Sequence, residues 1–224
     1  MKILGLSLSA DTHASLLIDG EIKSCVGEER IARIKNYSGF PFRAIEEVLK
    51  LESLKPSDID LVTVGFKDYM TIKDPLTIEV LMERGGDIDL SNEKPWWFRK
   101  SNLKSAIKGD FMRIFNIKDQ NITFGDSIKE KLKEMGIFAP VKTVQHHVAH
   151  ALSAYYFSNK SKNLVITADG YGDGLCGAVY KGIDGQLTEI SSTPKIHSLG
   201  VMYAAATKFL GFKSHKHEGK LTGL

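Results

Sequence analysis

The fold is decided by the beginning of the chain, where residues 3–26 read ILGLSLSADTHASLLIDGEIKSCV. This stretch holds short runs of strand-forming residues at Ile3–Ser9, Ala14–Ile18 and Ile22–Val26. Asp19-Gly20, between the last two runs, is the usual signal for a two-residue hairpin turn. The pattern therefore predicts that the fold begins with a meander of three strands.

A helix and a fourth strand follow this meander. From Pro41 onward, apolar residues recur at helical spacing across residues 42–49, with the proline at the helix start. Leu61–Gly65 is an apolar run typical of a buried strand. The order strand, strand, strand, helix, strand predicts an α/β fold with a ribonuclease-H-like lobe, whose first hairpin carries phosphate-binding or catalytic groups. Element order alone does not establish function.

The last hundred residues predict a second lobe on the same plan. A helix beginning at Asp126, a short strand at Val141–Val144 and a helix at Gln145–Phe157 lead to Leu164–Ala168, an apolar strand of the buried type. Two further strands that form a hairpin and a helix at Leu199–Leu210 follow. The meander of the first lobe is thus predicted to recur.

These elements predict two domains. We expect a first ribonuclease-H-like lobe over residues 1–162, with an insertion at about 67–120, and the start of a second lobe over 163–224. The insertion has an excess of basic residues and the pair Trp96-Trp97, which suits a solvated helix face or the docking of a nucleic acid or another domain. The last residue, Leu224, lies inside an unfinished element, so we expect a truncated second lobe and a fragment of a longer chain.

The composition is that of an ordinary globular protein. The chain has 224 residues, 42% of them hydrophobic and 25% charged, which excludes collagen-like, disulfide-scaffold and fully disordered proteins. A formal charge of +3 is too small to indicate a nucleic-acid or membrane-surface partner. Cys25 and Cys176 lie far apart in no metal-binding spacing, and no apolar run approaches the ~20 residues of a membrane span. We therefore expect a cytoplasmic protein.

A histidine cluster is the first group of candidate functional residues. Residues 145–155 read QHHVAHALSAY and hold three of the seven histidines of the chain. On a helix, His146 and His150 lie within roughly 40° of each other, the arrangement by which two imidazoles bind one metal ion, whereas His147 points about 100° away. His147 and His150 form an alternative pair, and partly exposed, hydrogen-bonded histidines at a helix N-terminus are the non-metal interpretation. The concentration of histidines favours a metal site.

A glycine-rich run, DGYGDG at residues 169–174, follows directly after a predicted buried strand. Backbone N–H groups of such a turn can approach phosphate oxygens, while Asp169 can hold a cation or polarise water. The run is neither a Walker loop nor a dinucleotide fingerprint, and a plain hairpin turn is the alternative. Because one helix and one strand separate it from the histidines, we expect the two groups to meet in one cleft.

The first hairpin is the equivalent position in the first lobe, where residues 9–15 read SADTHAS. Asp11, His13 and the three hydroxyl groups suit phosphate contact or acid–base catalysis, although such residues are also common in turns. Polar hairpins in both lobes favour a nucleotide bound between them.

Four separated motifs, in the same order, resemble the O-carbamoyltransferase family of nodulation proteins and antibiotic-modifying enzymes. They are GEERIARIK at 27–35, GFPFRAI at 39–45, HHVAHA at 146–151 and EGKLTGL at 218–224, and they extend over nearly the whole chain. The resemblance implies a two-lobed domain of the acetate kinase, sugar kinase, heat-shock chaperone and actin superfamily, close to the tRNA threonylcarbamoyladenosine enzymes.

The resemblance also implies ATP-dependent O-carbamoyl transfer. A C-terminal domain of the same chain, absent here, would make carbamoyl-adenylate from carbamoyl phosphate and ATP, and the domain seen here would pass the carbamoyl group to the hydroxyl of a small acceptor. On its own this fragment would be catalytically incomplete. The alternatives are a tRNA threonylcarbamoyladenosine-type transferase, a kinase of the same fold, and a metal- or nucleotide-binding regulatory module.

When the functional residues of the family are matched to this sequence one by one, the resemblance implies a metal site in the second lobe. His146, His150 and Asp169 would be ligands of a divalent metal, which the residue types leave open among Fe, Zn, Mn and Mg. Asp169 would also contact the phosphates, and Gly170 and Gly172 would line them.

The catalytic residues implied by the resemblance lie in the first lobe. His13 is the candidate general base, Lys35 would contact the acceptor or the carbamoyl group, and Asp11 would contact the nucleotide. Family members carry a His-Asp pair at the first hairpin, whereas this chain has Ala10 before Asp11 and its histidine at position 13.

Overall fold

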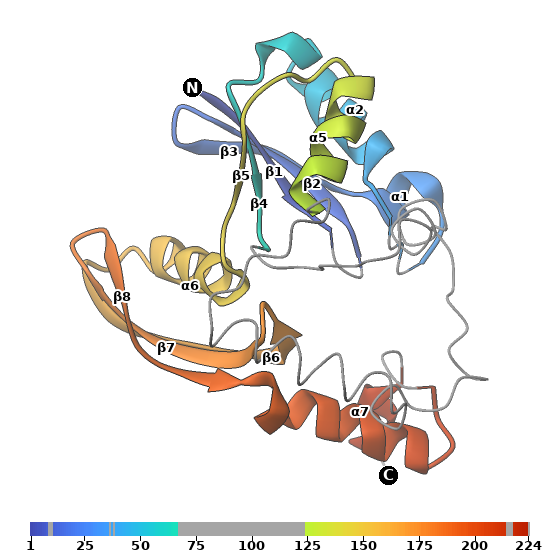
Figure 1. Cartoon of the computed structure of the whole chain (residues 1–224), viewed down its shortest axis with the longest axis vertical. Helices are drawn as coiled ribbons and strands as arrows, with labels where there is room; N and C mark the ends of the chain where they lie inside the picture. Colours follow the sequence, from blue (N-terminus) through green and yellow to red (C-terminus); the bar gives the residue numbers. More distant parts are fainter. Residues whose placement is uncertain (9–10, 36, 38, 67–123, 214–216, 224) are drawn as a thin grey trace.

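The fold consists of two β-sheets with helix α6 (His146–Phe157) between them (Figure 1). The computed structural model describes residues 1–8, 11–35, 37, 39–66, 124–213 and 217–223. The insertion predicted at about 67–120 lies outside the described residues. Within these ranges, every helix is too short or too polar to cross a membrane.

The first sheet has five strands in the order β3-β2-β1-β4-β5. β1, β2 and β3 pair antiparallel as the predicted meander, whereas β4 and β5 run parallel to β1. This is the ribonuclease-H-like strand order, and the predicted fold class is confirmed. The strands are β1 (Lys2–Ser7), β2 (His13–Ile18), β3 (Glu21–Gly27), β4 (Leu61–Val64) and β5 (Val141–Thr143).

Among the described residues, the first lobe has the helices α1 (Glu28–Ala32), α2 (Phe42–Leu51) and α5 (Phe124–Glu134) and the 3-10 turn η1 (Pro56–Asp58). α2 begins directly after Pro41, as its sequence predicts, and buries one apolar face on β2 and β3. Fully burying an aliphatic side chain stabilises the fold by roughly 1.5–3 kcal/mol. The core shared by strands and helices includes Leu4, Leu16, Ile45, Val48, Val62, Ile128 and Leu132.

The second sheet has three antiparallel strands, β6 (Lys162–Gly172), β7 (Leu175–Ile183) and β8 (Gln186–Pro194). The turn η4 (Lys195–His197) and helices α7 (Leu199–Phe209) and α8 (Glu218–Leu221) follow it. The predicted boundary at residue 162 assigns α6 to the first lobe, whereas its buried face packs on the second sheet. This smaller core holds Ala151, Tyr155, Val165, Ala178 and Tyr180.

Strand β6 runs further than the sequence predicts. The DGYG part of the glycine-rich run is strand and not turn, because a register shift after Ala168 lets Gly172 pair with Leu175. Only Asp173-Gly174 makes the turn, and both residues have positive φ, of 48° and 78°. This backbone matches the two-residue turn that suits the twist of a hairpin.

One face of the second sheet carries exposed apolar side chains. Val165 and Thr167 of β6 point toward α6 and are buried, whereas Leu164 and Ile166 on the opposite face are 61% and 69% exposed. Strand alternation places the two pairs on opposite faces. The second sheet is therefore covered on one face within the described ranges.

Candidate metal centre

Two side chains fix the first turn of α6 and thereby aim its histidines. The Gln145 side chain accepts a hydrogen bond from the Val148 N–H at 2.8 Å, as an N-cap does. Asp173, in the turn between β6 and β7, accepts one from the His146 N–H at 2.6 Å. Asp173 therefore ties the β6–β7 turn directly to the start of the helix.

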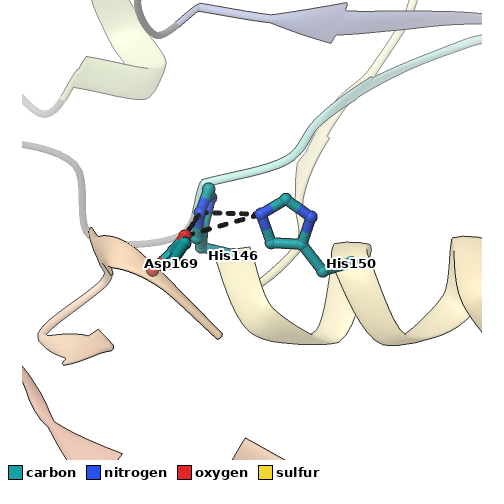
Figure 2. A group of neighbouring side chains, drawn as sticks. All are labelled: His146, His150 and Asp169. Atoms are coloured by element: carbon teal, nitrogen blue, oxygen red, sulfur yellow. Dashed lines mark hydrogen bonds and ion pairs between the residues drawn. The ribbon is translucent and has the colours of Figure 1, made fainter. Parts of the chain in front are cut away.

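His146, His150 and Asp169 converge at this point, as Figure 2 shows. The Nε2 atom of His146 lies 2.5 Å from Oδ2 of Asp169, and Nε2 of His150 lies 3.0 Å from Nε2 of His146 and 3.5 Å from the same carboxylate oxygen. The structure thus brings together the three residues predicted as metal ligands. Their candidate ligand atoms all lie within 4.8 Å of one another.

The first lobe holds the ring of His146 from the other side. Phe66, just after β4, stacks on it with ring centroids 4.4 Å apart. The backbone of Gly65, the residue before Phe66, is among the groups that raise the pKa of His146. His146 is therefore positioned by both lobes.

Gly172 makes room for the same ring. A Cβ atom built at this position would lie 2.1 Å from Cδ2 of His146, a distance that real contacts do not allow. At Gly170 an added Cβ would meet nothing within 4 Å. Close packing against His146 thus explains why residue 172 is a glycine. The family resemblance implies another reason, which is contact with the phosphates.

His147 lies next to the cluster although its helical position points elsewhere. It is fully buried, its Nδ1 lies 2.9 Å from Oγ1 of Thr167, and its Nε2 lies 3.4 Å from Oδ1 of Asp169. The ring centroid of His150 lies 4.5 Å from that of His146 and 6.1 Å from that of His147. The predicted pair His146 and His150 is therefore the closer one, and His147 faces the other carboxylate oxygen.

The charges of the cluster are coupled. Burial alone would raise the pKa of the Asp169 carboxyl, but the hydrogen bond with His146 and the charges of the three histidines outweigh it and lower the pKa. Burial likewise opposes protonation of His146, yet the hydrogen bond to Asp169 leaves its pKa raised. Burial and the neighbouring charge of His146 lower the pKa of His150. The shifts therefore favour the charged forms of His146 and Asp169 and the neutral form of His150.

The donor set fits a divalent metal. Two imidazoles and a carboxylate are the ligands of many catalytic zinc sites, which keep a fourth position open. Ligand atoms around a tetrahedral ion of this size are about 3.3 Å apart. The 3.0 Å and 3.5 Å that separate His150 from its two partners are close to this value, whereas the 2.5 Å between His146 and Asp169 is a direct hydrogen bond that a bound ion would open. Imidazole ligands suit Fe and Zn and the carboxylate suits Mn, whereas Mg prefers a set made of oxygen ligands.

The residues predicted at the first hairpin form a separate group. Asp11 has a φ of 63° and a buried Oδ1 atom without a hydrogen-bond partner among the described residues. Nδ1 of His13 contacts the carbonyl oxygen of Asp11, and its ring packs against Gly27. Lys35 is exposed. Within the described ranges, no interaction joins these three side chains to the histidine cluster.

Three residues around the centre were not predicted. Phe66, Thr167 and Asp173 stack on or hydrogen-bond the histidines. Only Asp173 had a local signal, because it stands in the glycine-rich run that the sequence singled out. The contacts of Phe66 and Thr167 depend on how the two lobes and α6 approach each other.

Comparison with known proteins decides the family. The family described as "Carbamoyltransferase N-terminus" matches residues 2–224. The chain belongs to this carbamoyltransferase family. The resemblance noted from the four motifs is thereby confirmed.

Relatives of the chain are much longer than it is. An uncharacterized protein from Synechocystis, sll1178, is 29% identical over 99% of the chain and 34% of the relative. Nodulation protein NolNO from Sinorhizobium fredii is 26% identical over 90% of the chain and 25% of the relative. The chain thus spans about a third or less of these relatives. The structure of YeaZ from Pseudomonas aeruginosa superposes on the chain with a TM-score of 0.42 at 13% identity, and the match covers 86% of this chain and 66% of YeaZ. The fold assignment rests on the strand order and not on this likeness.

Proposed function

We propose that the chain is the transfer part of an ATP-dependent O-carbamoyltransferase. In this proposal a carbamoyl group passes from carbamoyl phosphate, through carbamoyl-adenylate, to a hydroxyl of a small acceptor. The observation that carries it is the His146, His150 and Asp169 centre in a chain of the carbamoyltransferase family. The adenylate would be made by a further domain, which the greater length of the relatives accommodates.

The centre supports binding of an anionic nucleotide. His146, His150 and Asp169 would hold a divalent ion, for which Fe, Zn or Mn suits the donors, and the ion would supply positive charge beside the phosphate of the adenylate. The parallel strands β1, β4 and β5 end at the edge of the first sheet that meets α6, since Phe66 after β4 stacks on His146. Ligands of open α/β sheets bind at this edge.

His13 is suited to accept a proton. The carbonyl oxygen of Asp11 faces its Nδ1, so in the neutral ring the proton stays on Nδ1 and Nε2 carries the free electron pair. In the proposed step Nε2 takes the proton of the acceptor hydroxyl, the oxygen bonds to the carbamoyl carbon, and the bond from that carbon to the phosphate oxygen breaks. Adenosine monophosphate leaves with the electron pair of that bond.

Three other residues keep their proposed roles around this step. Lys35 is exposed and is proposed to contact the acceptor or the carbamoyl group. Asp11, near His13, and Gly170, where an added Cβ would meet nothing within 4 Å, are proposed to line the nucleotide. We place the enzyme in the cytoplasm, because Cys25 and Cys176 are both free, as is usual in a reducing compartment.

The experiment that tests this function uses the longest natural protein that contains the chain. Given carbamoyl phosphate labelled in its carbonyl carbon, ATP, a panel of sugar and antibiotic alcohols and, in a parallel reaction, tRNA, it is expected to release pyrophosphate and to transfer the label to an alcohol. Label transfer to tRNA alone, or phosphate transfer from ATP to an alcohol, would replace the proposal with the transferase or kinase alternative. The variant His13→Gln is expected to keep pyrophosphate release and to lose transfer.

A further inference from the structure

His147 has an unusual environment for a histidine beside a metal centre. It is fully buried on α6, and its ring lies between Thr167 and Asp169. Nε2 of His147 and Oδ1 of Asp169 are both buried, and neither has a hydrogen-bond partner among the described residues. Leaving a buried polar atom without a partner destabilises the fold, so two facing atoms of this kind require an explanation.

For a neutral His147, counting protons on Thr167 leaves two arrangements. Its Oγ1 accepts a hydrogen bond from the Ala178 N–H at 3.1 Å. Its single hydroxyl proton can go to Nδ1 of His147, at 2.9 Å, or to the Ala178 carbonyl oxygen, at 3.3 Å. The shorter distance is the one to His147.

The two arrangements differ in what faces Asp169. If Nδ1 of a neutral His147 carries the proton, the free electron pair of Nε2 points at a carboxylate oxygen, and two buried acceptors repel each other. If Thr167 donates to Nδ1, the proton of His147 is on Nε2 and points at Oδ1 of Asp169, 3.4 Å away. A shift of a few tenths of an ångström then makes a hydrogen bond and satisfies both atoms.

We propose that His147 is a positioning residue that holds Asp169 through Nε2–H, with Thr167 fixing its tautomer. This role rests on the proposed metal centre. In it, the two oxygens of the Asp169 carboxylate have different partners. Oδ1 faces His147, while Oδ2 faces His146 and His150 at 2.5 Å and 3.5 Å. The metal-facing oxygen is thereby set before any ion binds.

This assignment explains why adjacent histidines serve different purposes. His146 and His150 present Nε2 to one oxygen of Asp169, and His147 approaches the other from inside the second sheet. Residues that orient a metal ligand typically change metal affinity 10–100-fold when removed, so about this loss is expected without His147.

The tautomer is tested first, on the full chain without metal. In ¹⁵N NMR spectra of histidine side chains, the ring of His147 is expected to carry its proton on Nε2 in the wild type and in Thr167→Ser, which keeps the hydroxyl. A proton on Nδ1 in the wild type, with or without one on Nε2, overturns the proposal. This readout does not depend on whether the chain binds metal.

Metal affinity is tested second, by titration with Zn²⁺ alone and thermal unfolding of each metal-free variant. His147→Leu, which removes the donor, is expected to weaken Zn²⁺ binding about 10–100-fold, whereas His147→Gln, whose amide N–H can reach Asp169, is expected to restore most of it. Thr167→Val and Thr167→Ser form a second pair of the same kind, should His147→Leu fail to fold. Unchanged Zn²⁺ affinity in folded His147→Leu or Thr167→Val overturns the proposal. A wild type that binds no Zn²⁺ overturns the proposed metal centre instead. The role of His147 is then decided by the tautomer measurement.

Discussion

The two sheets differ in the size of their cores and in the candidate site residues that they carry. The first sheet has five strands and a large core built with α2 and α5, whereas the second has three strands and a core of a few side chains under α6. The histidine centre is built on the smaller sheet, with one ring held by Phe66 from the larger. The difference indicates that the first lobe supports the centre and the second lobe supplies its ligands.

The largest effect is expected from removing a core side chain of the first sheet. Leu16→Ala empties a fully buried position and should lower the free energy of unfolding by about 2–5 kcal/mol. Leu164→Ala, on the exposed face of the second sheet, should change it by less than about 0.5 kcal/mol. Chemical denaturation measures both, and equal losses would contradict the difference in burial between the core of the first sheet and the exposed face of the second.

A smaller but more local effect is expected at the glycines of β6. Gly172→Ala forces a Cβ atom into the ring of His146, so we expect a stability loss of about 1–3 kcal/mol together with weakened metal binding. Gly170→Ala is the matched control, because its Cβ meets nothing within 4 Å. Zn²⁺ titration of both variants is the measurement, and normal binding by Gly172→Ala would show that the ring of His146 is free to move.

The Asp-Gly turns give a third, smaller comparison. Asp173 and Asp184 both have positive φ, of 48° and 46°. They differ in that the Asp173 carboxylate accepts a hydrogen bond from the His146 N–H at the start of α6. Replacing either with alanine loses the same turn preference, so Asp173→Ala should cost about 1 kcal/mol more than Asp184→Ala, the usual value of a helix cap. Thermal unfolding of the two variants measures this difference. Equal losses would mean that the cap contributes nothing.

The smallest effect is a pH dependence of the metal-free chain. The pKa of His146 is raised, so its contribution to stability is present at low pH and is lost as pH rises through that raised value. The pKa of Asp169 is lowered, so its contribution is lost as pH falls through that lowered value. The wild type should therefore exceed Asp169→Asn in melting temperature most at weakly acidic pH, between the two values. A difference that does not change with pH would contradict the ion pair.

Much of the fold could be predicted because its signals are local. Alternation, helical periodicity and the Asp19-Gly20 turn act within a few residues, and the structure has the meander, α2 and the parallel strand β4 where the sequence places them. The end of β6 could not be predicted. Its glycines look like a turn in the sequence, and only pairing of Gly172 with Leu175 keeps them in a strand.

The centre could be predicted in part for the same reason. The spacing of His146 and His150 is a property of one helix, and Asp169 follows from its place after a buried strand. The roles of Phe66 and Thr167 depend on contacts between segments far apart in the chain, which no local pattern reports. His147 shows the limit most clearly, because its helical angle points away from His146 while tertiary packing turns its ring toward Asp169.

Metal content tests the central claim most directly. The full chain, loaded with Zn²⁺ or Fe²⁺, freed of excess ion and measured by elemental analysis, is predicted to hold about one ion per chain. His146→Ala, His150→Ala and Asp169→Asn are each predicted to lose it, while Gly170→Ala keeps it. A wild type without bound ion, or ligand variants that retain as much as the wild type, would contradict the account.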